Sequence, residues 1–324
     1  MPRLASAVMR ALTVLAAGVC ALAAHAQSYP AKPIRLVVPF VAGGGSDVIG
    51  RLLGQKLTPA LGQQVIVDNR PGGGATIGIE FGVRAEPDGY ILTLITPSYA
   101  INASLYPIKF DPVNDITPVV LFGKGPLVVL VHPSLQVKTM RGLISLAKAR
   151  PRQLLFGTAG QGTIIHLATE LFLEKTGLKM THVPYKGGAP ALTDLIAGQI
   201  SLVFTPVQTA LPQAKTGRVR ALAVTSAERI SAEPELPTIA ESGVPGYEAT
   251  NWFGIIGPKG LPQAVVDRIN GEVARAVRTK DVEERLRTDG ISPVGGPPQD
   301  LLAQINREIP QWRQVIARAH VKIE

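Results

Sequence analysis

Two glycine-rich segments of the chain have the residue types of anion-binding turns. Residues 41–47 read VAGGGSD and residues 158–163 read TAGQGT, and each precedes an amphipathic stretch. The first amides of a helix have no partner inside the helix, and the helix dipole adds partial positive charge there. Such a turn therefore suits a carboxylate or a phosphate. Glycine allows close approach of the backbone, and Ser46 and Thr163 add hydroxyl donors or caps. If both turns face one cleft, the sequence predicts one anion site.

The patterns that would indicate an enzyme are incomplete. Residues 45–52 have the glycine spacing of a phosphate loop but lack its lysine and the Ser or Thr that follows. Val48 and Ile165 stand where a dinucleotide-binding turn has its third glycine. Ser145 and Lys148 have Ser-x-x-Lys spacing, but they lie in an amphipathic stretch without the partner motifs of that enzyme class. We therefore predict no catalytic residue.

His166 and Glu170 lie one helical turn apart and could share a metal ion, but no other histidine shows ligand spacing near them. We predict instead that His166 is hydrogen-bonded and supports the turn at Gly160. Two interpretations of Asp47 stay open, a residue of the site or a first-turn carboxylate that stabilises the helix dipole. The sequence predicts no metal ion and no cofactor.

The elements that must position these turns alternate along the chain. From Ile34 onward, β-branched runs alternate with amphipathic stretches, which is typical of parallel strands connected by helices. We predict an α/β fold. The predicted strands are residues 34–38, 64–68, 90–95, 127–131, 154–157, 180–184, 200–204, 219–224 and 253–257. The predicted helices are residues 48–57, 140–149, 163–175, 190–197, 262–278, 301–308 and 312–319.

Length and composition exclude several classes of protein. The chain has 324 residues, of which 46% are hydrophobic and 18% charged, so it can bury a core and is not disordered. The length predicts about two domains. The net charge of +9 favours anionic partners. Nucleic acid is not expected, because the basic residues are scattered and aromatic residues make up only 5%.

The first 26 residues have the pattern of a secretory signal peptide. Arg3 and Arg10 precede an apolar run at residues 11–24, and small residues allow a cut near Ala26-Gln27. The run is too short for a spanning helix. The single cysteine lies inside it, after a valine that suits lipoprotein cleavage poorly. We predict export to the periplasm and a mature protein of charge +7, since the two leader arginines are removed from +9.

Seven segments, in order along the chain, carry a family resemblance. Residues 39–47 resemble the Pro-Phe-x-x-Gly-Gly-x-x-Asp loop of the Bug-type substrate-binding proteins of tripartite tricarboxylate transporters. The likeness continues through residues 69–74, 85–90, 160–168, 182–187, 237–241 and 252–254. The resemblance implies a type II periplasmic binding protein of two doubly wound, Rossmann-like domains joined by a hinge. It further implies a monomer that binds a di-/tricarboxylate or aromatic acid and hands it to a membrane permease, without catalysis.

The resemblance also implies two loops that hold a ligand carboxylate like pincers. The expected ligand-binding residues are Phe40, Ala42, Gly43, Gly44, Gly45, Ser46, Asp47, Ser98, Thr158, Ala159, Gly160, Gly162, Thr163, Tyr185 and Thr205, with His166 in support. Many members of the family have an acidic residue where this chain has Thr205. A carboxylate there would suit a ligand amine, so its absence favours a plain carboxylic acid over an amino acid.

We expect the first domain to comprise residues 27–126 and 249–324, and the second to comprise residues 127–248. Trp252 and Phe253 are expected in the core near the hinge, and residues 69–74 are expected to form a turn. Two other functions stay open. One is an exported α/β enzyme that acts on a carboxylate with His166 or Asp47, and the other is a ligand-sensing subunit of a signalling partner.

Overall fold

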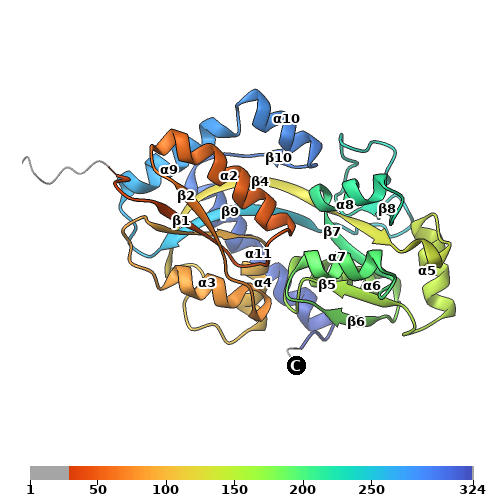
Figure 1. Ribbon diagram of the computed structural model, residues 1–324. Helices are drawn as coiled ribbons and strands as arrows, with labels where there is room; N and C mark the ends of the chain where they lie inside the picture. Colours follow the sequence, from red (N-terminus) through yellow and green to blue (C-terminus); the bar gives the residue numbers. More distant parts are fainter. Residues whose placement is uncertain (1–28, 323–324) are drawn as a thin grey trace, which may run out of the picture.

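The computed structural model describes residues 29–322, and its ten strands form one hydrogen-bonded sheet, eight of them along a single path. The path runs β2-β1-β3-β9-β4-β7-β5-β6, and β8 and β10 also pair with β4. Figure 1 shows one group of elements on the left and another on the right, with the yellow strand β4 running between them. The α/β class predicted from the sequence is confirmed.

The strands are β1 (Ile34–Val38), β2 (Val65–Asn69), β3 (Ile91–Ile95), β4 (Ile116–Val131), β5 (Leu155–Thr158), β6 (Thr181–Pro184), β7 (Leu202–Pro206), β8 (Arg220–Val224), β9 (Thr250–Pro258) and β10 (Ser292–Pro293). The helices are α2 (Gly45–Leu61), α3 (Thr76–Val83), α4 (Ser98–Leu105), α5 (Met140–Ala149), α6 (Ile164–Thr176), α7 (Gly188–Ile196), α8 (Val207–Lys215), α9 (Gln263–Ala276), α10 (Lys280–Thr288) and α11 (Pro298–Arg318). Short 3-10 turns lie at η1 (Gly73–Ala75) and η2 (Pro133–Leu135).

Strand β4 belongs to both groups of elements. Its first part pairs antiparallel with β9, from Ile116 opposite Pro258 to Pro126 opposite Thr250. Its last five residues pair antiparallel with β7 and β8. We call the part built on β1–β3, β9, β10 and the first part of β4 the first lobe. The part built on β5–β8 and the end of β4 is the second lobe. Strands joined by helices within a lobe, such as β1 and β2 or β5 and β6, are parallel as expected.

Each lobe has its own apolar core. One cluster of buried side chains draws mainly on residues 127–249, and two others draw on residues 34–122 and 252–305. The last five residues of β4 are fully buried, because helices cover both faces of a sheet of this kind. Burial of one such Leu or Val side chain contributes about 1.5–3 kcal/mol. Trp252 and Phe253 lie in these cores, at 0% and 1% exposure.

The C-terminal helix α11 contacts both lobes. Its buried residue Leu301 packs in the first lobe, whereas Trp312 packs in the core of the second. The two segments predicted here are one helix that continues through Pro310. The indole groups of Trp252 and Trp312 both donate to the buried Glu308 carboxylate, at 2.9 and 3.1 Å. Burial raises the pKa of Glu308, although these hydrogen bonds partly oppose the rise.

Four short helices and the first part of β4 were not predicted from the sequence. Helices α3, α4, α8 and α10 are only eight or nine residues long, and α8 contains a proline. The first part of β4 contains Pro118, Gly123 and Gly125, which interrupt a strand pattern.

The predicted signal peptide lies outside the described residues. Within the described residues, no helix has the length and apolar character needed to cross a bilayer.

Candidate functional site

A cavity of about 50 Å³ lies between the two lobes. Its walls come from the turn before α2, the ends of β3 and β7, the start of β9, and the beginnings of α4, α6, α7 and α8. Among the residues expected to bind the ligand, those that line it are Phe40, Gly43, Gly44, Gly45, Ser46, Ser98, Ala159, Thr163 and Thr205. The structure thus brings residues of the two glycine-rich turns to one cavity.

Five helices of the described chain begin at this cavity. Helices α2, α4 and α7 start at lining residues, and α6 and α8 follow directly after the lining residues Thr163 and Pro206. Each helix N-terminus carries about half a positive charge and amides without intrahelical partners. None of the lining residues is Asp, Glu, Lys, Arg or His. The positive potential at this cavity therefore comes from backbone dipoles, and its side-chain hydrogen-bond donors are uncharged.

The first turn is held in shape by Asp47. Gly43 adopts a left-handed φ of 82°, which a glycine accepts without strain. The Asp47 carboxylate accepts hydrogen bonds from the Gly43 amide, at 2.9 Å, from Arg51 Nε and from Asn69 Nδ2. Burial by itself raises the pKa of Asp47, but these bonds outweigh it and leave the pKa below its ordinary value. Asp47 does not line the cavity; it fixes the loop that does.

The second turn is capped by Thr163. The Thr163 hydroxyl donates to the Gly160 carbonyl at 2.8 Å and accepts from the His166 amide at 3.3 Å. Gly162 has a φ of 71°, and its amide donates to His166 Nδ1 at 3.3 Å. His166 therefore lies beneath this turn and supports it from outside the cavity.

A stack of rings lies behind the second turn. His182 lies between Phe156 and His166, with ring centroids at 4.9 and 4.3 Å. Its Nε2 is 2.7 Å from the Thr158 hydroxyl, which also accepts from the Gly160 amide. Burial, reinforced by the neighbouring His166, lowers the pKa of His182 to about 3. A neutral imidazole therefore supports the second turn through the Thr158 hydroxyl. This contact was not predicted from the sequence.

Six expected ligand-binding residues lie outside the cavity wall. They are Ala42, Asp47, Thr158, Gly160, Gly162 and Tyr185. Tyr185 and Gly160 line a separate hollow of about 370 Å³, which shares Phe40 and Ala159 with the cavity. The Tyr185 hydroxyl donates to Asp194 at 2.6 Å. Burial and this bond raise the pKa of Tyr185 to about 12.

Three polar residues of the wall were not singled out from the sequence: Thr96, Thr209 and Asn251. Thr96 directly follows β3, and residues at the carboxyl ends of strands are frequent in ligand sites of such folds, a signal that could have found it. Thr96 Oγ1 and Asn251 Oδ1 are buried without a hydrogen-bond partner in the described residues. Each unpaired buried group costs about 1–3 kcal/mol. On the opposite wall, the hydroxyls of Thr205 and Thr209 are 3.0 Å apart.

The lobes are closed around the cavity. Hydrogen bonds that cross between them include Ile164 N to Ser98 Oγ at 3.3 Å, Tyr106 Oη to the Gln161 carbonyl at 3.1 Å, and Gln208 Nε2 to the Gly45 carbonyl at 3.3 Å. A methyl group added at Gly45 would lie 2.9 Å from Cγ of Pro206. The backbone of the first turn thus touches the second lobe directly.

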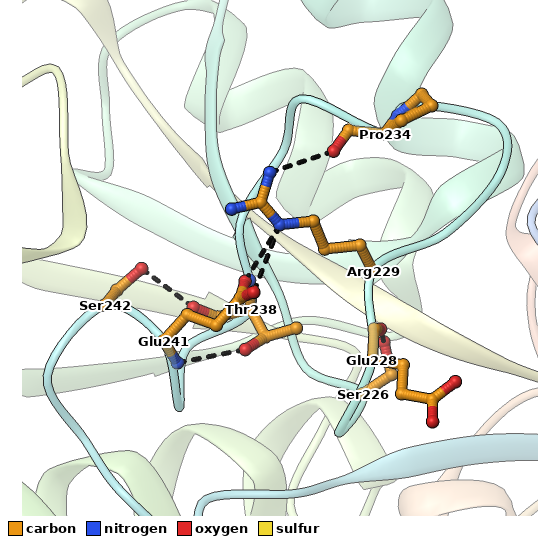
Figure 2. A network of polar contacts seen from close by, with 7 residues as sticks. All are labelled: Ser226, Glu228, Arg229, Pro234, Thr238, Glu241 and Ser242. Atoms are coloured by element: carbon orange, nitrogen blue, oxygen red, sulfur yellow. Dashed lines mark hydrogen bonds and ion pairs between the residues drawn. The ribbon is translucent and has the colours of Figure 1, made fainter.

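The motif at residues 237–241 has a structural role away from the cavity. Figure 2 shows Arg229 paired with the Glu241 carboxylate and bonded to the Pro234 carbonyl. Glu241 accepts from the Thr238 amide at 2.8 Å, and its own amide donates to the Thr238 hydroxyl at 3.0 Å. This reciprocal pairing fixes the loop after β8 in the manner of a capping box.

The residues considered as metal ligands form only a pair. His166 Nε2 lies 3.5 Å from Glu170 Oε1. Within residues 29–322, no three His, Cys, Asp or Glu side chains are grouped so that they could hold a metal ion.

Known proteins share this architecture over most of the chain. The sequence model of the family described as "Tripartite tricarboxylate transporter family receptor" matches residues 49–321. BugT of Bordetella pertussis is 36% identical over 302 residues, which cover 92% of this chain and 93% of BugT. The solved structure of Rpa4515 from R. palustris with adipate has 38% identity and a TM-score of 0.88, and covers 91% of this chain and 99% of that chain.

MatC from Rhodopseudomonas palustris, solved with bound malate, has 29% identity and a TM-score of 0.84, and covers 89% of this chain and 100% of that chain. These matches extend well beyond the seven segments quoted above and confirm the resemblance that those segments carry. This chain belongs to the tripartite tricarboxylate transporter receptor family, the Bug-type periplasmic solute-binding proteins.

Proposed function

We propose that the protein binds a small organic carboxylate between its lobes and delivers it to the permease of a tripartite tricarboxylate-type transporter. The observation that carries the proposal is the convergence of five helix N-termini on one cavity without a charged side chain. Backbone amides stabilise a carboxylate without the desolvation cost of burying a second ion. Two related proteins, Rpa4515 and MatC, were solved with adipate and with malate.

The proposed mechanism is closure of a hinge. Residues 27–126 and 249–324 would form one domain and residues 127–248 the other, with β4 and β9 crossing between them. A ligand that touches both lobes binds the closed state better than the open one, so it shifts the equilibrium by that difference in affinity. A cavity needs about 10–15 Å³ to hold one water molecule. The closed cavity of about 50 Å³ is therefore large enough for only a short acid. We propose that the closed monomer is what the permease recognises.

The alternative of an exported enzyme has less support. His166 and Asp47 were its candidate residues, and both lie outside the cavity wall. His166 accepts from the turn, and Asp47 is occupied by three donors. A general acid or base must reach the group that it protonates or deprotonates, and none of the side chains that line the cavity is of an acid–base type.

Thermal unfolding against a panel of mono-, di- and tricarboxylates, aromatic acids, amino acids and sugars tests the proposal. An acid at 100 times its Kd adds about 2.7 kcal/mol, which raises Tm by several degrees. We expect acids alone to raise Tm and to be recovered unchanged by NMR. Consumption of the acid would support the enzyme, and stabilisation only by sugars would reject the carboxylate site. Uptake of the labelled acid by cells that express the permease, with and without the receptor, separates transport from sensing.

A further inference from the structure

Two polar side chains of the cavity wall have no partner in the described residues. Thr96 and Asn251 are each 3% exposed, and Thr96 Oγ1 and Asn251 Oδ1 are buried without a hydrogen bond. Both residues line the cavity between the lobes. Buried polar groups in folded proteins are nearly always paired, so an unpaired one at a cavity needs a partner from whatever fills it.

The two groups lie on one side of the cavity. Thr96 follows the last residue of β3, and Asn251 is the second residue of β9, the neighbouring strand in the sheet of the first lobe. The cavity measures only about 50 Å³, so one small ligand reaches both side chains. The glycine-rich turns and the Thr205–Thr209 pair form other parts of the wall.

The chemistry of these groups restricts the ligand. The Asn251 carbonyl oxygen only accepts hydrogen bonds, so its partner must be a donor. An ionised carboxylate has no proton to donate, and a ligand ammonium group would be buried without a carboxylate to pair with, because no acidic residue lines the cavity. A hydroxyl group satisfies both partners at once, since it can donate to Asn251 Oδ1 and accept from the Thr96 hydroxyl.

We infer that Thr96 and Asn251 recognise a hydroxyl group on the ligand, so that the receptor selects short hydroxycarboxylates over acids of the same length without the hydroxyl. This inference rests on the proposed function, because it assumes that a carboxylate occupies the cavity. A site built to hydrogen-bond a hydroxyl group discriminates strongly against the analogue that lacks it, since the buried groups are then left unpaired. The contact to the hydroxyl, the contact to the carboxylate and the wall that faces the remaining substituent together select one enantiomer.

Calorimetric titration of the purified protein with matched pairs of acids tests the inference. The pairs are malate with succinate and lactate with propionate, with both enantiomers of malate and lactate. We expect one enantiomer of a hydroxy acid to bind at least about tenfold more tightly than its partner acid. Thr96→Val, which keeps the shape of the side chain, and Asn251→Leu should each reduce this ratio to about threefold or less. Both variants should leave the affinity for the acid without the hydroxyl unchanged or higher.

Thr193→Val is the matched control. It removes an exposed hydroxyl of α7 that lies outside the cavity wall and donates to the Ala189 carbonyl at 3.1 Å, so the ratio should stay as in the wild type. Equal binding of both acids of each pair overturns the inference alone and means that water completes these hydrogen bonds. A ratio that survives in both Thr96→Val and Asn251→Leu also overturns it. Failure of every carboxylate to bind overturns the proposed function, and the inference with it.

Discussion

The backbone amide of Ile164 donates a hydrogen bond of 3.3 Å to the hydroxyl of Ser98, and this bond joins the first turn of α6 in one lobe to the first residue of α4 in the other. Ser98 is fully buried and lines the cavity. The same residue therefore joins the two lobes and forms part of the cavity wall. If the cavity holds the ligand as proposed, closure and binding are coupled through such contacts, and the variants below separate them.

Ser98→Ala should weaken ligand binding by about 5- to 150-fold, because the Ile164 amide is left buried and unpaired in the closed state, at a cost of about 1–3 kcal/mol. Calorimetry with the best acid measures the loss. Ser104→Ala, on the same helix and outside the cavity, is the control and should bind like the wild type.

Tyr106→Phe removes a hydrogen bond between the lobes that lies outside the cavity. It should therefore weaken ligand binding by about 2- to 10-fold through its effect on closure alone. Unchanged affinity in both Ser98→Ala and Tyr106→Phe would exclude this coupling.

Gly45→Ala should prevent full closure. Its Cβ would lie 2.9 Å from Cγ of Pro206 in the other lobe, closer than real Cβ contacts. We expect at least about a tenfold loss of affinity, since a clash in the bound state costs about 1–3 kcal/mol, and a larger radius of gyration in the presence of ligand by small-angle scattering. Gly271→Ala, within α9, has no atom nearer than 4.0 Å and should leave affinity unchanged while stabilising the helix slightly. A Gly45→Ala protein that binds and compacts like the wild type would contradict the close approach of the lobes.

Asp47→Asn should destabilise the first turn by about 1–3 kcal/mol at pH 7, because an amide oxygen cannot serve all three donors. The pKa of Asp47 lies below 3.8 in the folded protein, so its contribution is present above that value and is lost as the pH falls through the lower pKa. Urea unfolding should therefore show a gap in the free energy of unfolding between wild type and variant at pH 7, and this gap should narrow as the pH falls below 3.8. The exposed Asp267→Asn, on α9, is the control. A gap that is constant with pH would argue against the ionised carboxylate as the cause.

His182 should make the protein less stable in mild acid. Its pKa is lowered from 6.5 to about 3 in the folded state, so the unfolded chain binds a proton that the folded chain does not. The contribution of His182 is fully present above pH 6.5 and is lost as the pH falls from 6.5 toward 3, by up to about 1.4 kcal/mol per unit. His182→Gln should show a shallower decline in free energy of unfolding over this window, with the exposed His320→Gln as the control. Parallel curves for wild type and His182→Gln would mean that the imidazole is not held neutral.

Much of the fold was predictable because its signals are local. Strand β1 and helix α5 have the bounds that periodicity indicates, residues 34–38 and 140–149. The first part of β4 was not predictable in this way, because its prolines and glycines are tolerated only by the pairing with β9. In α11, helix geometry continues through Pro310 because flanking side chains on both sides pack against the lobes, which a local rule about proline cannot anticipate.

The sequence by itself determined that two glycine-rich turns begin helices, since glycine, hydroxyl caps and helix periodicity act within about ten residues of chain. It also determined the family, because seven segments that resemble the family occur in the same order along the chain. Only the tertiary structure decided which residues meet. It places Thr96 and Asn251 in the wall of the cavity, Asp47 and Tyr185 outside that wall, and His182 behind the second turn. The physical reason is that burial and hydrogen-bond satisfaction depend on neighbours from distant elements, and closure of two lobes creates those neighbours.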